Sequence, residues 1–330
     1  MKPSDVTEAL TALIPTRRPV LIWGGPGTGK STVVRKAADM LGLALVDVRA
    51  TLLDPVDLRG LPRVNGKRTE WCPPCFLPED GAGVLFLDEL AQAMPAVQAA
   101  LLQLVLERRL GEYELPPDWS VVAASNRAED RAGVHRLISP LLNRFVHLDL
   151  DVCPQDWQEW AVGAGVAPEV RAFLRFRPEL LLSFDPSTNP RAFATPRSWN
   201  YVSDVLRCTS PLLLHRVVAG CVGDGAAAEF VAYLQLYRQL PDVDAVLSNP
   251  NAIPLPKEPA VLFALIGALT ARARSDRSLV PAFARVGMRL PDEFGMLALR
   301  DALAIDRTLV ADPAVQQWVA QARGKGLFAA

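Results

Sequence analysis

The sequence lacks a long apolar run. Half of its 330 residues are apolar, yet no run reaches the roughly 18 residues that a helix needs to cross a bilayer. Residues 1–6 also lack the basic and then apolar layout of a secretory signal peptide. We therefore expect a cytoplasmic protein that contacts no membrane. A chain of this length can bury a core in two domains, or in one large domain with an appendage.

Cysteine, histidine and excess charge of either sign are also scarce. The chain has five scattered cysteines and three histidines, which is not the pattern of a disulfide framework. Cys72 and Cys75 form a Cys-Pro-Pro-Cys pair, but structural zinc needs four ligands and no second pair follows. We interpret both as incidental reduced thiols. The net charge of −1 makes nucleic acid an unlikely partner of the whole chain.

The first half of the sequence alternates between strand and helix patterns. Short apolar runs that end in turn residues predict strands, and longer segments with one apolar face predict helices. The predicted strands are 19–23, 43–48, 83–87, 119–125 and 145–150, the helices are 30–41 and 97–106, and a hairpin is expected at 109–119. Such alternation predicts an α/β domain with a parallel sheet covered by helices on both faces.

The second half is predicted to be all-α. Helical segments separated by proline-bearing breaks are expected at 156–164, 168–176, 198–206, 212–221 and 226–240. Residues 241–259 contain five prolines and indicate an irregular connection, after which two or three further helices close the chain. The basic cluster of Arg171, Arg175 and Arg177 is interpreted as a solvated helix face.

One segment carries a specific chemical signal. Residues 24–31 satisfy the pattern Gly-x-x-x-x-Gly-Lys-Ser/Thr between a predicted strand and a predicted helix. Glycines let consecutive N–H groups curl around phosphates, Lys30 supplies charge to the β and γ phosphates, and the Ser31 hydroxyl can ligate Mg²⁺. The residues expected to bind ATP are Gly24, Gly25, Pro26, Gly27, Thr28, Gly29, Lys30, Ser31 and Thr32. The loop alone does not separate a kinase, a GTPase and a motor ATPase.

A second signal follows the predicted strand at 83–87, which ends in Asp88 and Glu89. The end of this strand should lie beside the phosphate loop in a parallel sheet. Asp88 can then hold Mg²⁺ through its water shell, and Glu89 can polarise the water that attacks the γ-phosphate. The alternative is a pair of acids that merely face solvent.

Taken in order, these motifs resemble the AAA+ ATPase superfamily, P-loop NTPases in which a parallel sheet is sandwiched by helices, and within it the MoxR-like branch. The resemblance covers roughly residues 15–205. It implies that Asn126 is the sensor of the γ-phosphate, although an Asx turn is an alternative. It also implies that Arg144, in the segment 141–145, is the arginine finger that reaches a neighbouring subunit. Arg136 is a rival for that role, and pairing of Arg144 with a local acid is the structural alternative.

The resemblance extends to a lid and to two exposed segments. Arg197, in Thr-Pro-Arg at the start of a predicted helix, is similar to the second sensor, with Arg191 as a rival. Residues 108–119 resemble the hairpin inserted before the sensor strand. Residues 57–71, with Phe76 beyond, match a loop that faces the central pore in such rings. Exposed connectors without client contact are the alternative.

The change of pattern after about residue 151 and the proline-rich connection, together with the resemblance, predict a domain organisation. Residues 1–152 would form the AAA+ nucleotide-binding core, 153–240 an α-helical lid, and 241–330 an α-helical C-terminal extension of unknown role. The part after about residue 205 is longer than the usual lid. It is interpreted as an extended lid, an assembly surface or a docking site.

The function implied is that of an ATP-hydrolysing, chaperone-like motor with Mg²⁺ as cofactor. It would form a homo-oligomer, a hexameric ring, and remodel or activate a partner bearing a von Willebrand factor A domain. Two alternatives stay open. One is a nucleotide-gated assembly switch that works by ATP binding alone, and the other is a nucleic-acid-stimulated motor, which the balanced charge disfavours.

Overall fold

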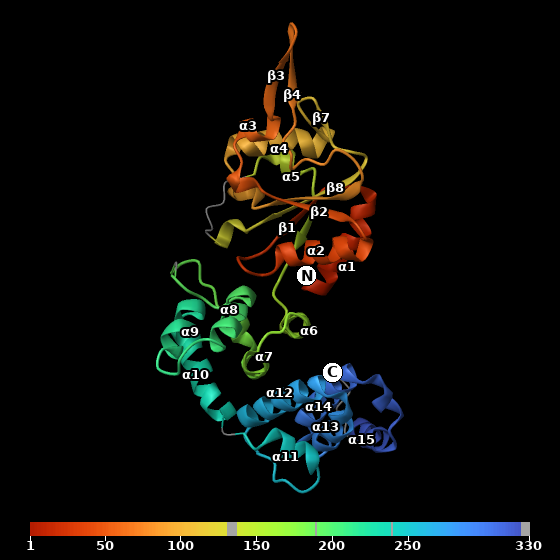
Figure 1. Ribbon diagram of the computed structural model, residues 1–330, viewed down its shortest axis with the longest axis vertical. Helices are drawn as coiled ribbons and strands as arrows, with labels where there is room; N and C mark the ends of the chain where they lie inside the picture. The colour runs from red at the N-terminus through yellow and green to blue at the C-terminus, as the bar shows by residue number, and fades with distance from the viewer. Residues whose placement is uncertain (131–136, 189, 239, 325–330) are drawn as a thin grey trace. The chain divides into compact units, whose positions relative to one another are not determined.

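The computed structural model describes residues 1–130, 137–188, 190–238 and 240–324. They fall into two compact units (Figure 1). The first comprises Met1–Trp157, Phe184–Pro190 and Thr195–Arg197, and the second Gln158–Ser183, Arg191–Ala194 and Ser198–Ala330. The three-part division expected from the sequence stays a prediction. Among the helices described, none combines the length and apolar character of a membrane span.

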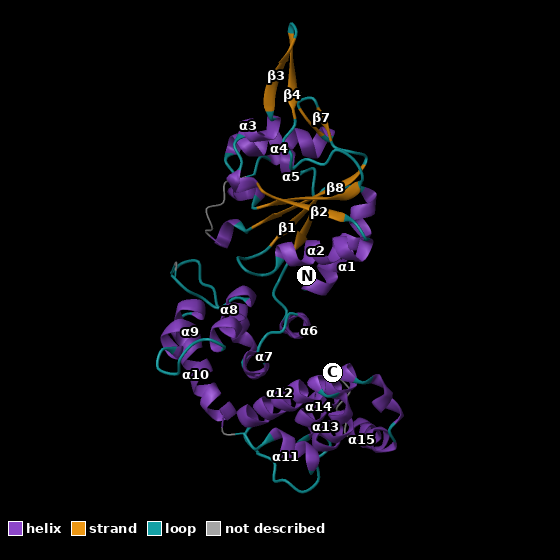
Figure 2. Ribbon diagram, in the orientation of Figure 1, coloured by secondary structure: helices purple, strands orange, loops and turns teal. Residues whose placement is uncertain are grey.

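A five-stranded parallel sheet forms the centre of the first unit (Figure 2). Its strand order is β2-β5-β8-β1-β9, and every neighbouring pair is parallel. The strands are β1 (Val20–Trp23), β2 (Ala44–Arg49), β5 (Ala82–Asp88), β8 (Asp118–Ser125) and β9 (Val146–Asp149). The predicted α/β class and all five predicted strands are confirmed.

Alternation along the strands divides the core between the two faces of the sheet. Val20 and Ile22 of β1 pack with α1 (Pro3–Leu13) and α2 (Lys30–Leu41) on one face. Leu21, between them, packs on the other face with α4 (Pro95–Glu107). All three side chains are fully buried. Burial on both faces explains why this strand is a continuous apolar run, as in other parallel sheets.

Smaller elements surround the sheet. They are α3 (Pro55–Arg59), α5 (Ser139–Leu142), and the hairpins β3 (Leu61–Asn65) with β4 (Arg68–Cys72) and β6 (Arg109–Leu110) with β7 (Tyr113–Glu114). The second hairpin confirms the one expected at 109–119. The first replaces an expected loop. Helix α1 has no counterpart among the elements that the sequence analysis predicted.

The second unit is helical, as predicted, and α6 (Pro154–Gly163) runs into it from the first. Its other helices are α7 (Pro168–Phe176), α8 (Pro196–Leu206), α9 (Leu214–Val222), α10 (Asp224–Arg238), α11 (Val243–Ser248), α12 (Pro259–Ser275), α13 (Val280–Gly287), α14 (Asp292–Ile305) and α15 (Pro313–Gly324).

Two expectations for the helical part are wrong. The proline-rich segment contains the short helix α11, because the Asp242 carboxylate caps it by accepting hydrogen bonds from the N–H groups of Asp244 and Ala245. Four helices rather than two or three follow, counting α12 to α15 in the described residues. Helix α11 fits between Pro241 and Pro250, in a stretch without proline.

The solvated face expected for Arg171, Arg175 and Arg177 is also wrong for Arg175. Its side chain is 13% exposed and forms an ion pair with Asp301 of α14, which is 8% exposed. Thr270 of α12 donates a hydrogen bond of 3.0 Å to the same carboxylate. A buried guanidinium needs such a partner, and α7 carries Arg175 on the side that packs against α12 and α14.

Candidate functional site

The phosphate loop connects β1 to α2 and adopts the conformation that its glycines permit. Gly27 and Gly29 have φ values of 71° and 97°, in the left-handed region where a side chain is strained. The N–H of Gly24 donates to the Ser125 carbonyl at 3.2 Å, which ties the start of the loop to the end of β8. Thr28 closes the loop internally by donating to the Gly25 carbonyl at 2.9 Å.

Lys30 lies at the start of α2 and points back into the loop. Its ammonium group donates to the carbonyls of Gly24 at 2.8 Å and Gly25 at 2.9 Å, and to Asn126 Oδ1 at 2.8 Å. All three of its donors are therefore engaged. Burial lowers the pKa of this amine from 10.5 to about 8, and its effect exceeds the opposing pull of the nearby carboxylates, led by Asp88.

Asp88 and Glu89 come together with Ser31 at the same edge of the sheet. Ser31 donates from Oγ to Asp88 Oδ2 at 3.0 Å, and the Glu89 N–H donates to Asp88 Oδ1 at 2.9 Å. Glu89 has a φ of 59°, which is uncommon for a residue with a side chain. This turn of the chain directs the Glu89 carboxylate differently from that of Asp88.

Thr51 is a site residue that the sequence analysis did not identify. Its hydroxyl donates to Glu89 Oε2 at 2.7 Å. It follows β2, the strand that pairs in parallel with β5, so the strand ends bring the two residues together. No motif marks a threonine at this position, and only the strand order could have indicated it.

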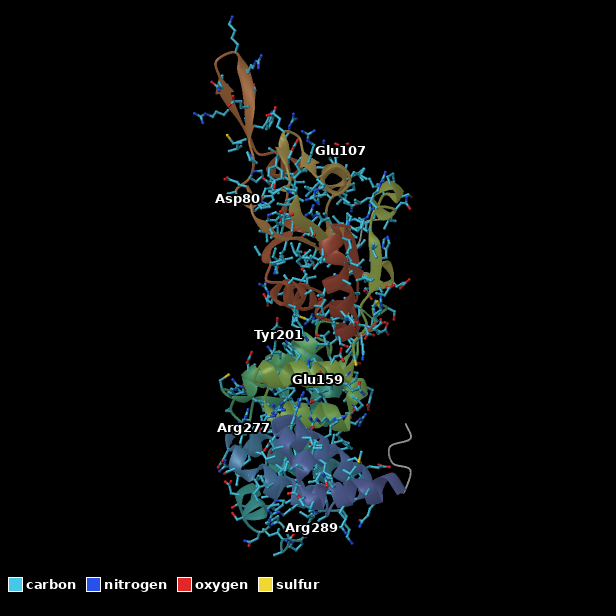
Figure 3. All side chains as sticks on the ribbon, turned by 90° about the vertical axis from the view of Figure 1, so that its right-hand side faces the viewer. Asp80, Glu107, Glu159, Tyr201, Arg277 and Arg289 are labelled. Carbon is cyan, nitrogen blue, oxygen red and sulfur yellow. The ribbon has the colours of Figure 1, made fainter. Side chains whose placement is uncertain are left out.

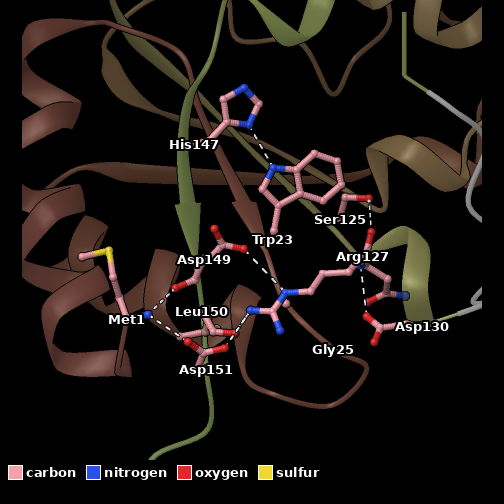
Figure 4. A network of polar contacts seen from close by, with 12 residues as sticks. Met1, Trp23, Gly25, Ser125, Arg127, Asp130, His147, Asp149, Leu150 and Asp151 are labelled. Carbon is pink, nitrogen blue, oxygen red and sulfur yellow. Dashed lines mark hydrogen bonds and ion pairs between the residues drawn. The ribbon is translucent and has the colours of Figure 1, made fainter. Parts of the chain in front are cut away.

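Asn126 directly follows β8, and Arg127 fixes the chain beyond it (Figure 4). The Arg127 guanidinium pairs with Asp151 at 2.7 Å and with Asp149 at 3.5 Å. The backbone N–H of Arg127 donates to the Asp130 carboxylate at 3.0 Å. The hydrogen bond from Arg127 lowers the pKa of the Asp151 carboxyl. Asn126 was predicted from its motif, whereas no sequence signal indicated this anchor at the end of β9.

The segment that precedes Arg197 packs on the phosphate loop. A side chain added to Gly27 would meet Thr195 Oγ1 at 2.8 Å, so Thr195 packs closely on the loop. The charge of Arg197 contributes to lowering the pKa of Lys30. Arg197 is exposed at the start of α8, whereas its rival Arg191 belongs to the helical unit.

Arg144 is exposed and stands apart from this cluster. It makes no ion pair with any residue in the described part of the chain. Its rival, Arg136, lies outside the described residues. A hollow of about 320 Å³ beside Arg144 is lined by Ser139, Leu142, Asn143, Phe145 and His147.

His147 connects the Arg144 segment to the strand that leads into the phosphate loop. The Trp23 indole donates to His147 Nδ1 at 2.9 Å, and His147 Nε2 is 2.9 Å from the Leu142 carbonyl. Because an indole N–H is only a donor, Nδ1 accepts and Nε2 carries the proton. The neutral ring therefore satisfies both partners, of which Figure 4 shows the Trp23 indole.

The donors at this edge fit a magnesium–triphosphate group. Lys30 is a half-buried cation at a helix N-terminus, where anions bind favourably. Ser31 and Asp88 offer hard oxygen atoms, the ligands that Mg²⁺ prefers. Within the described residues there is no group of three or more His, Cys, Asp or Glu side chains that could hold a metal ion. Ser31 and Asp88 would supply two of the ligands of such an ion. The sheet and this loop define a P-loop nucleotide-binding domain.

Comparison with known proteins places this domain in a family. Residues 19–145 match the model of the AAA domain (dynein-related subfamily). Protein MoxR of Paracoccus denitrificans is 36% identical over 167 residues, which are 48% of this chain and 45% of that protein. Midasin of Giardia intestinalis is 31% identical over 156 residues, 44% of this chain and 3% of midasin. A crystal structure of NtrX from Brucella abortus in complex with ADP has 17% identity and a TM-score of 0.43, covering 83% of this chain and 65% of that chain.

Residues 19–145 thus form an AAA domain, and the chain is MoxR-like over about half of its length. The match spans less than half of the Paracoccus MoxR protein and a small part of midasin. The roles of the individual site residues stay predictions.

Proposed function

We propose that this chain is an ATPase that couples nucleotide hydrolysis to the remodelling or activation of a partner protein. One observation carries the proposal: Lys30, Asn126, Ser31, Asp88 and Glu89 converge at one edge of the sheet through hydrogen bonds of 2.8 to 3.0 Å. A triphosphate bound there would meet a cation, an orienting amide and two carboxylates. Those are the groups that phosphoryl transfer to water requires.

Each residue would act through its own chemistry. Lys30 would exchange its carbonyl partners for phosphate oxygens, and Asn126, released from Lys30, would orient the attacking water. Glu89, held by Thr51, would accept a proton from that water. Mg²⁺, held by Ser31 and Asp88, would supply charge neutralisation at the phosphates.

The exposure of Arg144 supports assembly. It is exposed and unpaired within the described chain, so it is available to a neighbouring subunit. We propose a homo-oligomeric ring, hexameric by its resemblance to the family, in which Arg144 completes the adjacent site. Arg197 would couple phosphate loss to movement of α8. By the same resemblance, the partner would bear a von Willebrand factor A domain.

Substitution of Glu89 by Gln tests the hydrolytic step. We expect Glu89→Gln to bind ATP as the wild type does, while phosphate release falls by roughly 10²-fold or more, because a general base contributes about that much. Glu107→Gln, on the exposed end of α4, is the matched control and should keep the wild-type rate. Wild-type turnover by Glu89→Gln would exclude Glu89 as the base. ATP binding without turnover by the wild type would favour the assembly switch.

Mixing two inactive variants tests the shared site. Arg144→Ala retains Glu89, and Glu89→Gln retains Arg144. If the finger acts across the interface, an Arg144→Ala subunit beside a Glu89→Gln neighbour regains a complete site, and the mixture recovers phosphate release. Arg300→Ala, exposed on α14, should be active alone. A mixture as inactive as its components, despite proven co-assembly, would contradict the role of Arg144 in a neighbour's site.

A further inference from the structure

The β3–β4 hairpin projects from the sheet domain with its side chains in solvent (Figure 3). Every residue of β3 is exposed, and Leu61 and Val64 are 71% and 77% exposed. A two-stranded hairpin is at best marginally stable alone. Its base is fixed instead by Gly60, where a side chain would lie 2.0 Å from the Cys72 carbonyl oxygen. The exposed hairpin is therefore held in a defined direction.

The strand register gives the hairpin two different faces. Pro62 pairs with Trp71 and Val64 with Thr69, so these four side chains share one face. The opposite face and the turn carry the charges, and we call this surface the basic tip. It consists of Arg63, Lys67 and Arg68.

The basic tip is not neutralised within its own chain. None of its three cations forms an ion pair with a described residue. The only carboxylate on the hairpin, that of Glu70, accepts a hydrogen bond from Asn65 at 2.7 Å. Three cations face one carboxylate here, although the whole chain has a net charge of −1. Such a concentrated field attracts an anionic partner.

The hairpin's aromatic residue helps to decide which anion fits. Single-stranded nucleic acid is bound by basic grooves together with aromatic side chains on which bases stack. Trp71 is the single aromatic of the hairpin, and the Arg59 guanidinium covers its ring at 4.1 Å from the centroid. Arg59 Cγ also lies 3.8 Å from the position that a Cβ on Gly111 would take. The Arg59 side chain therefore fills the space beside the β6–β7 hairpin. The one aromatic ring of the hairpin therefore already carries a cation on its face, which favours a protein segment over stacked bases.

We infer that the basic tip binds an acidic, extended segment of a client protein. The inference rests on the proposed function, because it assigns the client chemistry of that motor. Arg63 and Arg68 lie on the same strand face and Lys67 lies in the turn between the strands. Aspartate and glutamate side chains of an extended chain can reach all three, and the unpaired outer edges of β3 and β4 can accept its backbone.

A fluorescein-labelled poly-glutamate 20-mer is the probe for this surface. Its binding to the full chain, carrying Glu89→Gln and saturated with ATP, is measured by fluorescence anisotropy. The triple variant Arg63→Glu, Lys67→Glu, Arg68→Glu reverses the tip. The control variant Lys257→Glu, Arg300→Glu, Arg307→Glu makes the same charge change on exposed positions of the helical unit. Nucleotide binding by each variant establishes that it is folded.

We expect reversal of the tip to weaken poly-glutamate binding by roughly tenfold or more, since like charges at an interface repel strongly. The control variant should bind poly-glutamate with an affinity within about twofold of that of the unreversed chain. Added salt should weaken the binding of poly-glutamate to the unreversed chain. Equal loss in both variants, or no loss on tip reversal, would overturn the inference. Preference for an oligo-dT 20-mer would replace the protein client by nucleic acid. Loss of self-assembly by the tip variant alone would identify a second copy as the occupant. Absence of ATP turnover in the wild type would count against the motor, not against the tip.

Discussion

Lys30 carries a positive charge in surroundings that do not favour it. Burial lowers its pKa to about 8 against 10.5 for a free lysine. Between these two values the unfolded chain binds more protons than the folded one, so this group makes stability rise with pH. The free-energy cost of burying the charged amine is fully present below pH 8, the range in which that charge is available to bind phosphate. The site thus holds a cation whose environment improves when an anion binds.

Proton uptake on nucleotide binding follows from this pKa. Phosphate oxygens favour the charged amine and raise the pKa of Lys30, so at about pH 8.5 binding of ATP should take up a fraction of a proton. Titration calorimetry in two buffers of different ionisation enthalpy measures it. Lys36→Arg, at an exposed position on α2, should take up as many protons as the wild type. Equal uptake by a Lys30→Arg variant that still binds ATP would contradict the assignment to Lys30.

Arg127 is predicted to position Asn126 without touching the substrate. Arg127→Gln removes the ion pairs with Asp149 and Asp151, so the end of β8 should shift. We expect kcat to fall by roughly 10- to 100-fold with KM changed by less than about threefold, because small misplacements of catalytic groups act mainly on the chemical step. Steady-state phosphate release separates the two constants.

The same strand provides the control for Arg127. Arg17 pairs with Asp118 at the other end of β8, and Arg17→Gln should leave both constants unchanged. Arg127→Lys should recover part of the lost kcat, since it keeps the charge. A rise in KM with unchanged kcat would instead place Arg127 in nucleotide binding.

Individual elements differ in how clearly the sequence specifies them. The buried strands were predictable, because residues such as Leu21 and Leu85 belong to continuous apolar runs between turn residues. Hairpin β3–β4 was not, because Leu61, Arg63 and Asn65 share one exposed face and give no apolar alternation. A strand that faces solvent on both sides lacks the pattern on which such predictions depend.

Gly60 should determine whether this hairpin forms. Its φ of 83° and ψ of −161° belong to glycine, and a side chain would collide with Cys72 at 2.0 Å. Gly60→Ala should therefore abolish hydrogen-exchange protection over residues 61–72 while the central sheet keeps its own. Gly66 at the turn has a φ of 62° and free space around the position of a side chain. Gly66→Ala should therefore destabilise the hairpin by only about 1–2 kcal/mol. Equal protection in both variants would refute the steric argument.

At the scale of the whole molecule, charge burial distinguishes the two units. Each ion pair described in the sheet unit has at least one exposed partner, such as Asp151, which pairs with the half-buried Arg127. In the helical unit Arg175 and Asp301 are 13% and 8% exposed and join α7 to α14. Gly267 of α12 adds close packing, since a side chain there would meet Ala172 of α7 at 2.7 Å. Helices α7, α12 and α14 therefore share one polar connection inside the unit.

Removal of one partner should destabilise this unit strongly. Asp301→Ala leaves the Arg175 guanidinium buried without its carboxylate and should lower the free energy of unfolding by about 3–5 kcal/mol. Urea denaturation followed by circular dichroism measures it. Glu179→Gln breaks the exposed pair with Arg177 and should cost less than about 1 kcal/mol. A double variant, Arg175→Met with Asp301→Leu, should recover most of the loss, and equal costs for the buried and exposed pairs would contradict the account.

The sequence by itself determined the features that neighbouring residues specify. The phosphate loop, the helix that follows it, the apolar strands and the acids after β5 each lie within a few residues, so spacing and periodicity predict them. Tertiary structure alone decided which distant groups meet. Thr51 with Glu89, Arg127 with Asp151 and Arg175 with Asp301 are 38, 24 and 126 residues apart. Strand order and helix packing bring these pairs together, and no local pattern records that choice because a hydrogen bond depends on distance in space and not along the chain.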